Sequence, residues 1–208
     1  MPGDSLPESN NRPPNAVAAQ PIAALAFLIA AGLALGFALA GPATDRPDRF
    51  ATIEPDRIYR GAYPHPHELR WLASDLGIRG VVSLMKEAPT APRAQAERRT
   101  AVELKLSYRE FELPGDGLAG FDTLDAAADA IDELQRIGPV YLHCAAGKQR
   151  SNAATAVYRM RHCGWTAEQA IDELARRYGL DRAAEAALCD HLRRYYRERI
   201  AGTAPAAR

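Results

Sequence analysis

Short apolar runs alternate with helical patterns through most of the chain after residue 50. Four runs predict β-strands, at residues 58–60, 80–84, 108–113 and 140–142. Helices are predicted at residues 66–76, 92–106, 151–162, 166–178 and 183–200. In the first of these helices Leu69, Leu72 and Leu76 share one face. Strands separated by helices predict parallel βαβ units, so we expect an α/β domain over residues 56–200 with ligands at the carboxyl ends of its strands.

The N-terminal region follows a different pattern. Residues 1–15 are polar and rich in proline, which predicts a disordered tail. Residues 22–40 then form a run without a charge, and this run extends back to residue 16. At about 1.5 Å per residue, a helix of this length just crosses a hydrocarbon core of about 30 Å. We therefore expect one transmembrane helix at 16–41, a linker at 42–55 and a short tail at 201–208.

A cleaved signal peptide is the alternative for the apolar run, because Ala-Leu-Ala at 38–40 matches a small-x-small cleavage site. The run exceeds the usual length of about 7–15 residues, and Arg12 is the only basic residue before it, so we favour a retained anchor. Arg46, Arg49 and Arg57 follow the run closely. By the positive-inside rule we expect a single-pass membrane protein with its folded domain in the cytoplasm, the alternative being a periplasmic or other extracytoplasmic domain.

Composition excludes several classes of function. The chain has 26 basic and 26 acidic residues, so its formal net charge of zero creates no overall field that would attract nucleic acid. Its three cysteines, Cys144, Cys163 and Cys189, include no CxxC pair. Neither a disulfide framework nor a structural zinc site is predicted from them.

The candidate chemistry lies in the segment Val-Tyr-Leu-His-Cys-Ala-Ala-Gly-Lys-Gln-Arg-Ser at 140–151. A strand runs into Cys144, a loop follows, and a helix begins near Ser151. Loop amides that turn inward, together with the helix N-terminus, can surround an anion such as phosphate. Arg150 can hold two phosphate oxygens with its planar guanidinium group. The same field lowers the pKa of Cys144 and favours a nucleophilic thiolate near neutral pH.

The His-Cys-x5-Arg-Ser pattern of this segment resembles the signature of the cysteine-based protein tyrosine phosphatase superfamily. Two earlier runs, Arg-Ile-Tyr-Arg-Gly at 57–61 and Leu-Gly-Ile-Arg-Gly-Val-Val-Ser-Leu at 76–84, resemble the opening of atypical dual-specificity phosphatases. The resemblance covers roughly residues 56–177. It implies a three-layer phosphatase-like domain, in which helices flank a mostly parallel sheet of four or five strands.

The resemblance also implies a role for each residue of the segment. Cys144 would form a phosphocysteine intermediate, Arg150 would bind the phosphoryl group, and Ser151 would help the thiolate to leave. His143 would tune the thiolate through hydrogen bonds to nearby backbone. The phosphate-binding loop would consist of Ala145, Ala146, Gly147, Lys148, Gln149 and Arg150. No metal or other cofactor is expected, because Arg150 and the loop amides supply the positive charge.

A general acid is implied on a mobile loop some thirty residues before the cysteine. Asp116 stands there between Gly115 and Gly117, and it would later activate water as a base. The alternative for Asp116 is an ordinary turn aspartate. Asp122 is the second candidate for the acid, although its position before Leu124 suits a helix N-cap better.

The sequence leaves the substrate and the oligomeric state open. A chain this short lacks the insertions that deepen a tyrosine-specific pocket, so we expect activity on phosphotyrosine and phosphoserine or phosphothreonine proteins. Lys148 matches a loop position where relatives that act on inositol phosphates or phosphoinositides often carry lysine, which makes such small or lipid substrates the alternative.

A rhodanese-like sulfurtransferase and a binding-only pseudophosphatase are further alternatives. The five residues between Cys144 and Arg150 favour phosphate over the shorter rhodanese loop, and a pseudophosphatase would normally lack one of these two residues.

Overall fold

The computed structural model describes residues 45–203 of the 208-residue chain. These residues belong to one compact unit, Thr44–Arg208. The transmembrane helix predicted at 16–41, the tail at 1–15 and the last five residues lie outside the described part. Within residues 45–203, no helix is both long enough and apolar enough to span a membrane.

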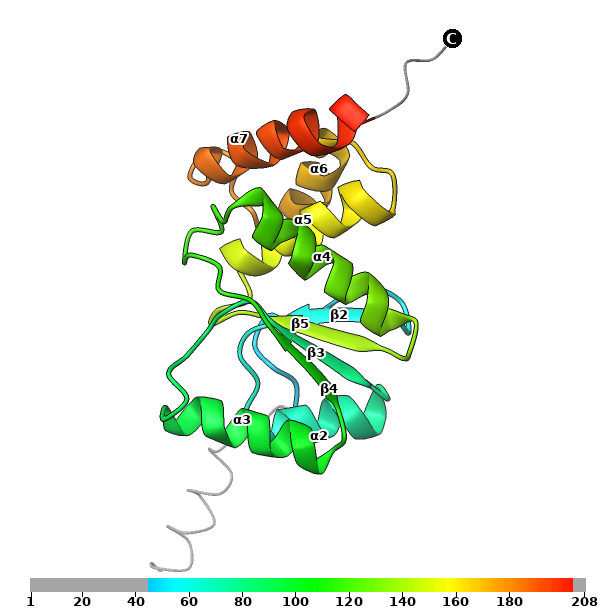
Figure 1. Ribbon diagram of the computed structural model, residues 1–208, viewed down its shortest axis with the longest axis vertical. Helices are drawn as coiled ribbons and strands as arrows, with labels where there is room; N and C mark the ends of the chain where they lie inside the picture. Colours follow the sequence, from blue (N-terminus) through cyan, green and yellow to red (C-terminus); the bar gives the residue numbers. More distant parts are fainter. Residues whose placement is uncertain (1–44, 204–208) are drawn as a thin grey trace, which may run out of the picture. The chain divides into compact units, whose positions relative to one another are not determined.

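A sheet of five strands forms the middle layer, in the order β1-β2-β5-β3-β4 (Figure 1). The strands are β1 (Ala51–Glu54), β2 (Ile58–Gly61), β3 (Gly80–Ser83), β4 (Ser107–Glu110) and β5 (Val140–His143). Strands β2, β5, β3 and β4 are parallel, whereas β1 runs antiparallel to β2. The predicted α/β class and mostly parallel sheet are therefore confirmed.

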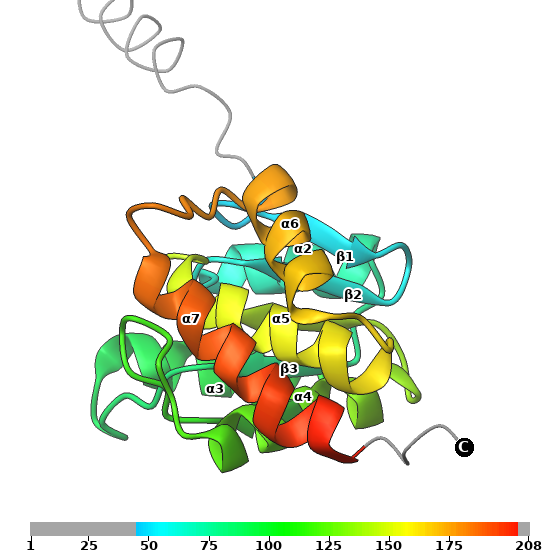
Figure 2. The same ribbon diagram turned by 90° about the horizontal axis from the view of Figure 1, so that it is seen from above.

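Helices cover both faces of this sheet. On one face lie α2 (Pro66–Asp75) and α3 (Pro92–Glu103) (Figure 1). On the other lie α4 (Phe121–Gln135), α5 (Gln149–His162), α6 (Ala167–Arg177) and α7 (Ala186–Tyr195), which continues into the π-helical turn η1 (Tyr196–Ile200) and the 3-10 turn η2 (Ala201–Thr203). Helix α5 lies in the middle of this group (Figure 2), and its residues 151–160 are all buried.

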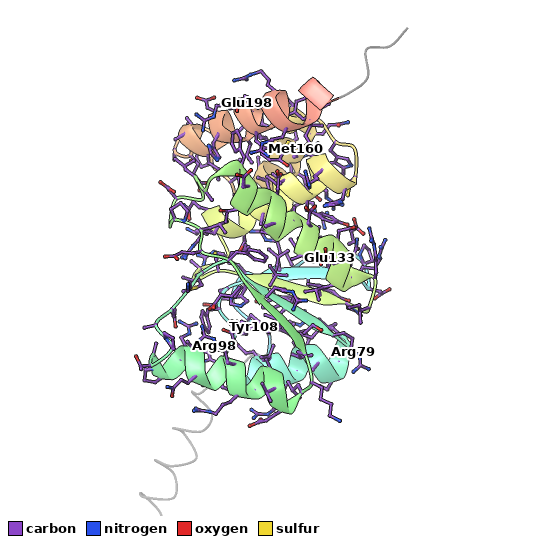
Figure 3. All side chains as sticks on the ribbon, viewed as in Figure 1. Arg79, Arg98, Tyr108, Glu133, Met160 and Glu198 are labelled. Carbon is purple, nitrogen blue, oxygen red and sulfur yellow. The ribbon has the colours of Figure 1, made fainter. Side chains whose placement is uncertain are left out.

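The core is divided by the sheet into two clusters, because successive side chains of a strand point to opposite faces. Tyr59 and Tyr141 pack with α2 and α3, while Val140 and Leu142 pack with the helices on the other face. Figure 3 shows side chains filling both spaces, with Met160 among the helices of the larger group. Burial on both faces explains why the central strands appear as continuous apolar runs in the sequence.

Two segment assignments need correction. Residues 51–54, which the sequence assigned to the linker, form the edge strand β1; only Ile53 of this strand is fully buried, so no apolar run marks it. The last helix begins at Ala186 rather than at residue 183, because Asp181 accepts hydrogen bonds from the amides of Ala183 and Ala184 and holds a turn there. By contrast, Thr166 caps α6 as its position suggests, in a reciprocal capping box with Gln169.

Candidate active site

The predicted phosphate loop lies at the carboxyl edge of the parallel strands. Strand β5 ends at His143, Cys144 follows, and α5 begins at Gln149. Ligand sites of open α/β sheets occur at this edge. Cys144 is only 2% exposed, whereas Lys148 on the rim of the loop is exposed to solvent.

Three consecutive carbonyls of the loop are held on its outer side by separate donors. These donors are the amide of Tyr63, 3.4 Å from Ala145 O, Nη1 of Arg49, 3.1 Å from Ala146 O, and Nη2 of Arg60, 3.0 Å from Gly147 O. In a trans peptide the carbonyl and the following N–H point in opposite directions. The three following amides, of residues 146–148, therefore face the inner side of the loop. An anion-binding cup results, since the outward carbonyls fix the inward amides.

The sulfur of Cys144 faces this cup. Burial raises the pKa of Cys144, but hydrogen bonds from the Ser151 hydroxyl and from the amides of Ser151, Lys148 and Ala146 together outweigh it. The net pKa of Cys144 therefore lies below the ordinary value for a thiol. The Ser151 hydroxyl donates to Cys144 Sγ over 3.2 Å. These donors stabilise negative charge on the sulfur, which is the reactive form of a cysteine.

Gly147 is the position at which the loop requires glycine. Its φ of +63° lies in the left-handed region. A Cβ atom there would lie 2.7 Å from the carbonyl carbon of Gly61 and 2.8 Å from the amide nitrogen of Ala62. The end of β2 therefore supports the turn of the loop by direct backbone contact.

Arg150, the last residue of the predicted phosphate loop, is half-buried. Its Nε is buried and, among the described residues, has no hydrogen-bond partner. No carboxylate of residues 45–203 forms an ion pair with its guanidinium group. A guanidinium group that is not neutralised by the protein can donate two parallel hydrogen bonds to phosphate oxygens.

Asp116 lies beside the phosphate loop, on the segment between β4 and α4. Asp116 and Gln149 line the same cavity of about 270 Å³, together with Leu118 and Leu188. The neighbouring Gly117 packs so closely on α5 that a Cβ atom would lie 2.8 Å from Gln149 O. The Asp116 carboxylate is exposed and accepts a hydrogen bond of 3.0 Å from the amide of Leu118. The Asp116 side chain is therefore accessible to solvent beside the first residue of α5.

Asp122, the second candidate for the acid, is engaged elsewhere. It receives a hydrogen bond of 2.5 Å from Arg199. The N-cap of α4 is Gly120, so the expectation that Asp122 caps this helix is wrong. Because the helix starts at Phe121, Asp122 lies within the first turn instead, where a carboxylate still interacts favourably with the helix dipole.

His143 contacts a carboxylate, not nearby backbone as the resemblance implied. Its Nε2 lies 2.8 Å from Glu97 Oε1, and both side chains are buried. This distance is that of an ion pair, although the angle is not that of a hydrogen bond. Tyr108 donates to the other Glu97 oxygen over 2.9 Å. Burial raises the pKa of Glu97, but the electrostatic effect of the nearby His143 and hydrogen bonds from Tyr63 and Tyr108 lower it overall.

The site also includes Arg49, Arg60, Tyr63 and Glu97, which were not predicted from the sequence. Arg60 carried a usable signal, because it is a charged residue at the end of a buried strand and directly before a glycine. Arg49 stands in the expected linker, and Glu97 stands in a mostly polar helix. The pattern of apolar and polar residues around either position is the same as around a solvent-exposed residue.

A cysteine in a cup of amides, an arginine that pairs with no carboxylate of residues 45–203 and an exposed aspartate nearby, on a three-layer α/β domain, are typical of cysteine-based phosphatases. Residues 47–200 match the family model described as "Swiss Army Knife protein, DSP-PTPase phosphatase domain" (PTP-SAK), and the chain belongs to this family. The resemblance noted in the sequence is thereby confirmed. The protein is a phosphatase of the protein-tyrosine and dual-specificity class.

Individual relatives agree with this assignment. The chain is 29% identical over 140 residues to human phosphatidylglycerophosphatase and protein-tyrosine phosphatase 1, covering 65% of this chain and 67% of that protein. It is 30% identical over 171 residues to the dual specificity protein phosphatase TpbA of Pseudomonas aeruginosa, covering 75% of this chain and 73% of the relative. The crystal structure of PTPMT1 in complex with PI(5)P has a TM-score of 0.59 at 21% identity, and the match covers 73% of this chain and 96% of that one. At this identity the structural match supports the fold alone.

Proposed function

We propose that the protein hydrolyses phosphomonoesters through a phosphocysteine intermediate on Cys144. The thiolate attacks the phosphorus atom, a new S–P bond forms, and the P–O bond to the leaving group breaks. Water then attacks the phosphocysteine, phosphate is released and the thiolate returns. The observation that carries this proposal is the set of donors around Cys144 Sγ, namely the Ser151 hydroxyl at 3.2 Å and the loop amides that lower the pKa of Cys144.

In this proposal the positive charge that stabilises the negatively charged transition state comes from the protein itself. Arg150 binds two phosphoryl oxygens, and the amides of the loop 145–150 bind the others. The Ser151 hydroxyl stabilises the thiolate when it is expelled in the second step. No metal is needed, so a chelator should leave the activity unchanged.

Asp116 acts in this mechanism as the general acid and then as the general base. Its carboxylic acid protonates the leaving oxygen in the first step, and its carboxylate takes a proton from water in the second. Its exposure on the rim of the cup and its place beside Gln149 support this role.

The primary substrates in this proposal are phosphoproteins with phosphotyrosine, phosphoserine or phosphothreonine. Exposure of Asp116 and Lys148 at the rim supports a shallow cup that admits all three side chains. An inositol phosphate or phosphoinositide is the second candidate. It is supported by Lys148 and by the PI(5)P in the PTPMT1 crystal structure, whereas the name of the human relative gives a different lipid phosphate, phosphatidylglycerophosphate.

We also propose that residues 16–41 anchor the protein in a membrane with the catalytic domain in the cytoplasm. A chain that stays in the membrane fraction after alkaline extraction, with residue 1 still present, supports this anchor. A mature chain that begins near residue 41 would instead show cleavage of a signal peptide and an extracytoplasmic domain.

The test is an assay with p-nitrophenyl phosphate on the wild type and on Cys144→Ser, Asp116→Asn and Asp122→Asn variants. We expect no turnover in Cys144→Ser, and in Asp116→Asn a kcat lower by about 10²–10⁴-fold with little change in phosphate binding. Asp122→Asn is the matched control and should retain its activity. Turnover by Cys144→Ser would reject the thiol mechanism, full turnover by Asp116→Asn would remove Asp116 from it, and cyanide-dependent transfer from thiosulfate would indicate a sulfurtransferase instead.

A further inference from the structure

Asp116 lies in a short turn whose two ends are buried. The turn spans residues 114–119, between β4 and α4. Leu113 before the turn and Ala119 at its end are each 3% exposed, whereas Asp116 is exposed. Among the described residues the Asp116 carboxylate is held only from within the turn, by the amide of Leu118 over 3.0 Å. The place of this carboxylate therefore depends on what holds the turn.

The carbonyl at the end of this turn contacts His191 of α7. His191 Nε2 lies 2.9 Å from Ala119 O, although 72 positions separate the two residues in the sequence. This is the only hydrogen bond that residues 45–203 make to Ala119 O. A buried carbonyl needs a donor, because water does not reach it. The contact with His191 therefore fixes the end of the turn to α7.

Arg194 determines which nitrogen of His191 carries the proton. Its Nη2 lies 3.1 Å from Nδ1 of the imidazole ring. Because a guanidinium group can only donate, Nδ1 accepts this hydrogen bond. The proton of the neutral ring then lies on Nε2, which donates it to Ala119 O. The guanidinium group, the ring and the carbonyl thus form one chain of hydrogen bonds.

Phe121, the first residue of α4, packs on the same imidazole ring. The centroid of the Phe121 ring lies 5.1 Å from that of His191 and 5.3 Å from that of Tyr195. The guanidinium group of Arg194 lies over Phe121, 5.2 Å from its centroid. The ring of His191 is therefore held by packing as well as at both of its nitrogens, which fixes its orientation.

We propose that His191 is a positioning residue for the general acid: through Ala119 O it holds the turn so that Asp116 stays beside the phosphate loop. Asp116 and Gln149 line the same cavity, so the turn places the acid next to the start of α5. Proton transfer to a leaving oxygen requires hydrogen-bond distance, so a small displacement of the turn weakens the acid while the cup stays intact. The proposal rests on the phosphatase function proposed above and adds a residue of α7 to it.

The first experiment compares two substrates that differ in their need for an acid, with all variants made in the full chain. Phenyl phosphate expels a more basic oxygen than p-nitrophenyl phosphate, so its hydrolysis depends more on protonation of the leaving group. We expect His191→Leu to lower kcat/KM by about tenfold for phenyl phosphate and by about threefold or less for p-nitrophenyl phosphate. Equal losses for the two substrates would indicate a general loss of folded enzyme and would overturn the positioning role.

Further substitutions separate the hydrogen bond from the space that the ring fills. Glutamine can donate through Nε2 and accept through Oε1, so His191→Gln should keep kcat/KM for phenyl phosphate within about threefold of the wild type. Asparagine carries the same groups on a shorter side chain, and His191→Asn should behave like His191→Leu. Equal impairment of the glutamine and asparagine variants would contradict the proposal. His162→Leu is the matched control, because that ring contacts Asp129 instead of the turn, and it should not change the ratio between the substrates.

A double-mutant cycle tests whether His191 acts through Asp116. In an Asp116→Asn background, His191→Leu should change kcat/KM for phenyl phosphate by less than about twofold, because the group that it positions is already lost. A further tenfold loss in that background would show that His191 acts on another part of the site, and the proposal would be wrong.

Amide hydrogen exchange separates failure of this proposal from failure of the proposed function, because it needs no turnover. The Gly117 amide donates to Pro114 O over 2.9 Å inside the turn. We expect its exchange to be faster in His191→Leu than in the wild type by about fivefold or more, the equivalent of one hydrogen bond, and unchanged in His162→Leu. If exchange accelerates but Asp116→Asn keeps full turnover, His191 holds the turn and the assignment of the acid fails. Unchanged exchange in His191→Leu overturns the positioning role whatever the activity.

Discussion

At the scale of single residues, the reactivity of Cys144 depends on neutral donors more than on a neighbouring base. The Ser151 hydroxyl and the inward amides lower the pKa of Cys144 against the opposing effect of its burial. The buried His143 is directed at Glu97 instead. The thiolate is therefore stabilised by hydrogen bonds that do not themselves titrate near neutral pH.

Ser151→Ala should raise the pKa of Cys144, because one hydrogen bond to the thiolate is lost while its burial remains. A hydrogen bond to a charged group contributes about 1.5–3 kcal/mol, so losing it should raise the pKa of Cys144 measurably. The pH at which alkylation by iodoacetamide reaches half its maximal rate should therefore be higher in Ser151→Ala than in the wild type. Ser74→Ala removes an exposed hydroxyl outside the loop and should leave the profile unchanged. Identical profiles for the wild type and Ser151→Ala would contradict this role.

At the scale of elements, the phosphate loop takes its shape from β2 and the segment before β1. Arg49, Arg60 and the amide of Tyr63 hold the outward carbonyls, and the backbone of Gly61 limits the space at Gly147. The unit of β5, the loop and α5 therefore does not determine the shape of the cup alone. Strand β2 and the segment before β1 support the loop from outside this unit.

Gly147→Ala tests this support at its closest contact. Alanine at a left-handed position costs about 1–2 kcal/mol wherever it occurs. At Gly147 the clash with Gly61 and Ala62 should add about 1–3 kcal/mol, as overpacking does, and should also distort the cup and reduce phosphatase activity. Urea unfolding and an activity assay measure the two effects.

Gly164→Ala is the matched control for this substitution. Gly164 has a φ of +71°, but a Cβ atom there meets nothing within 4 Å. This variant should show the conformational cost alone and retain activity. Equal losses of stability in the two variants would mean that β2 does not support the loop as described.

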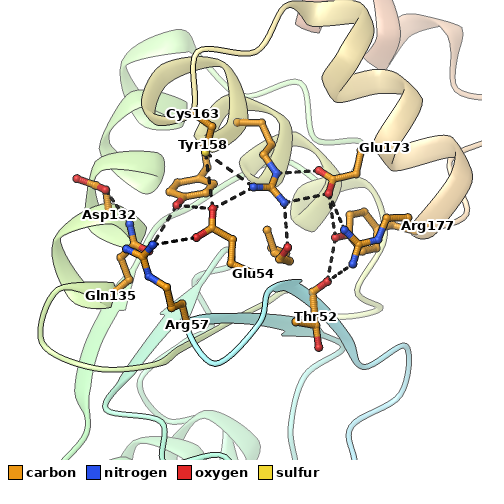
Figure 4. A network of polar contacts seen from close by, with 12 residues as sticks. Thr52, Glu54, Arg57, Asp132, Gln135, Tyr158, Cys163, Glu173 and Arg177 are labelled. Carbon is orange, nitrogen blue, oxygen red and sulfur yellow. Dashed lines mark hydrogen bonds and ion pairs between the residues drawn. The ribbon is translucent and has the colours of Figure 1, made fainter.

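At the scale of the whole molecule, a buried polar network joins the edge of the sheet to the outer helices. Arg159 of α5 donates to Glu173 of α6, to Glu54 of β1 over 3.0 Å and to Ile53 O over 2.9 Å. Tyr158 also donates to Glu54, and Figure 4 shows Glu54, Tyr158 and Glu173 in this network. The network fixes β1 against α5 and α6.

Arg159→Met should be among the most destabilising substitutions in the domain. It leaves the Glu173 carboxylate buried with only Arg177 as an ionic partner, and removing one member of a buried pair costs about 3–5 kcal/mol. Arg161→Met, two residues along the same helix, removes ion pairs with the partly exposed Asp129 and with Asp125. Because Asp125 keeps Arg199 as a partner, the loss should be about 0–1 kcal/mol. Denaturant unfolding measures both. A loss for Arg159→Met no larger than for Arg161→Met would refute the importance of the network.

The fold was predictable where burial leaves a pattern in the sequence. Strands β2, β3 and β5 are covered on both faces, so they appear as apolar runs, whereas β1 buries only Ile53 fully and was missed. The loop of the site was predictable because its residues are consecutive. Its supports were not, because Arg49 and Arg60 meet the loop across 97 and 87 residues and nothing local marks such a pairing.

These long separations have a consequence for how the enzyme matures. During synthesis Arg49 and Arg60 are made first. The loop carbonyls to which they donate emerge from the ribosome only after many further residues. The phosphate-binding loop therefore reaches its final shape late, since that shape depends on contacts that close loops of 87 and 97 residues, and such long-range contacts form slowly. Recovery of catalysis during refolding should consequently coincide with the final assembly of the central strands.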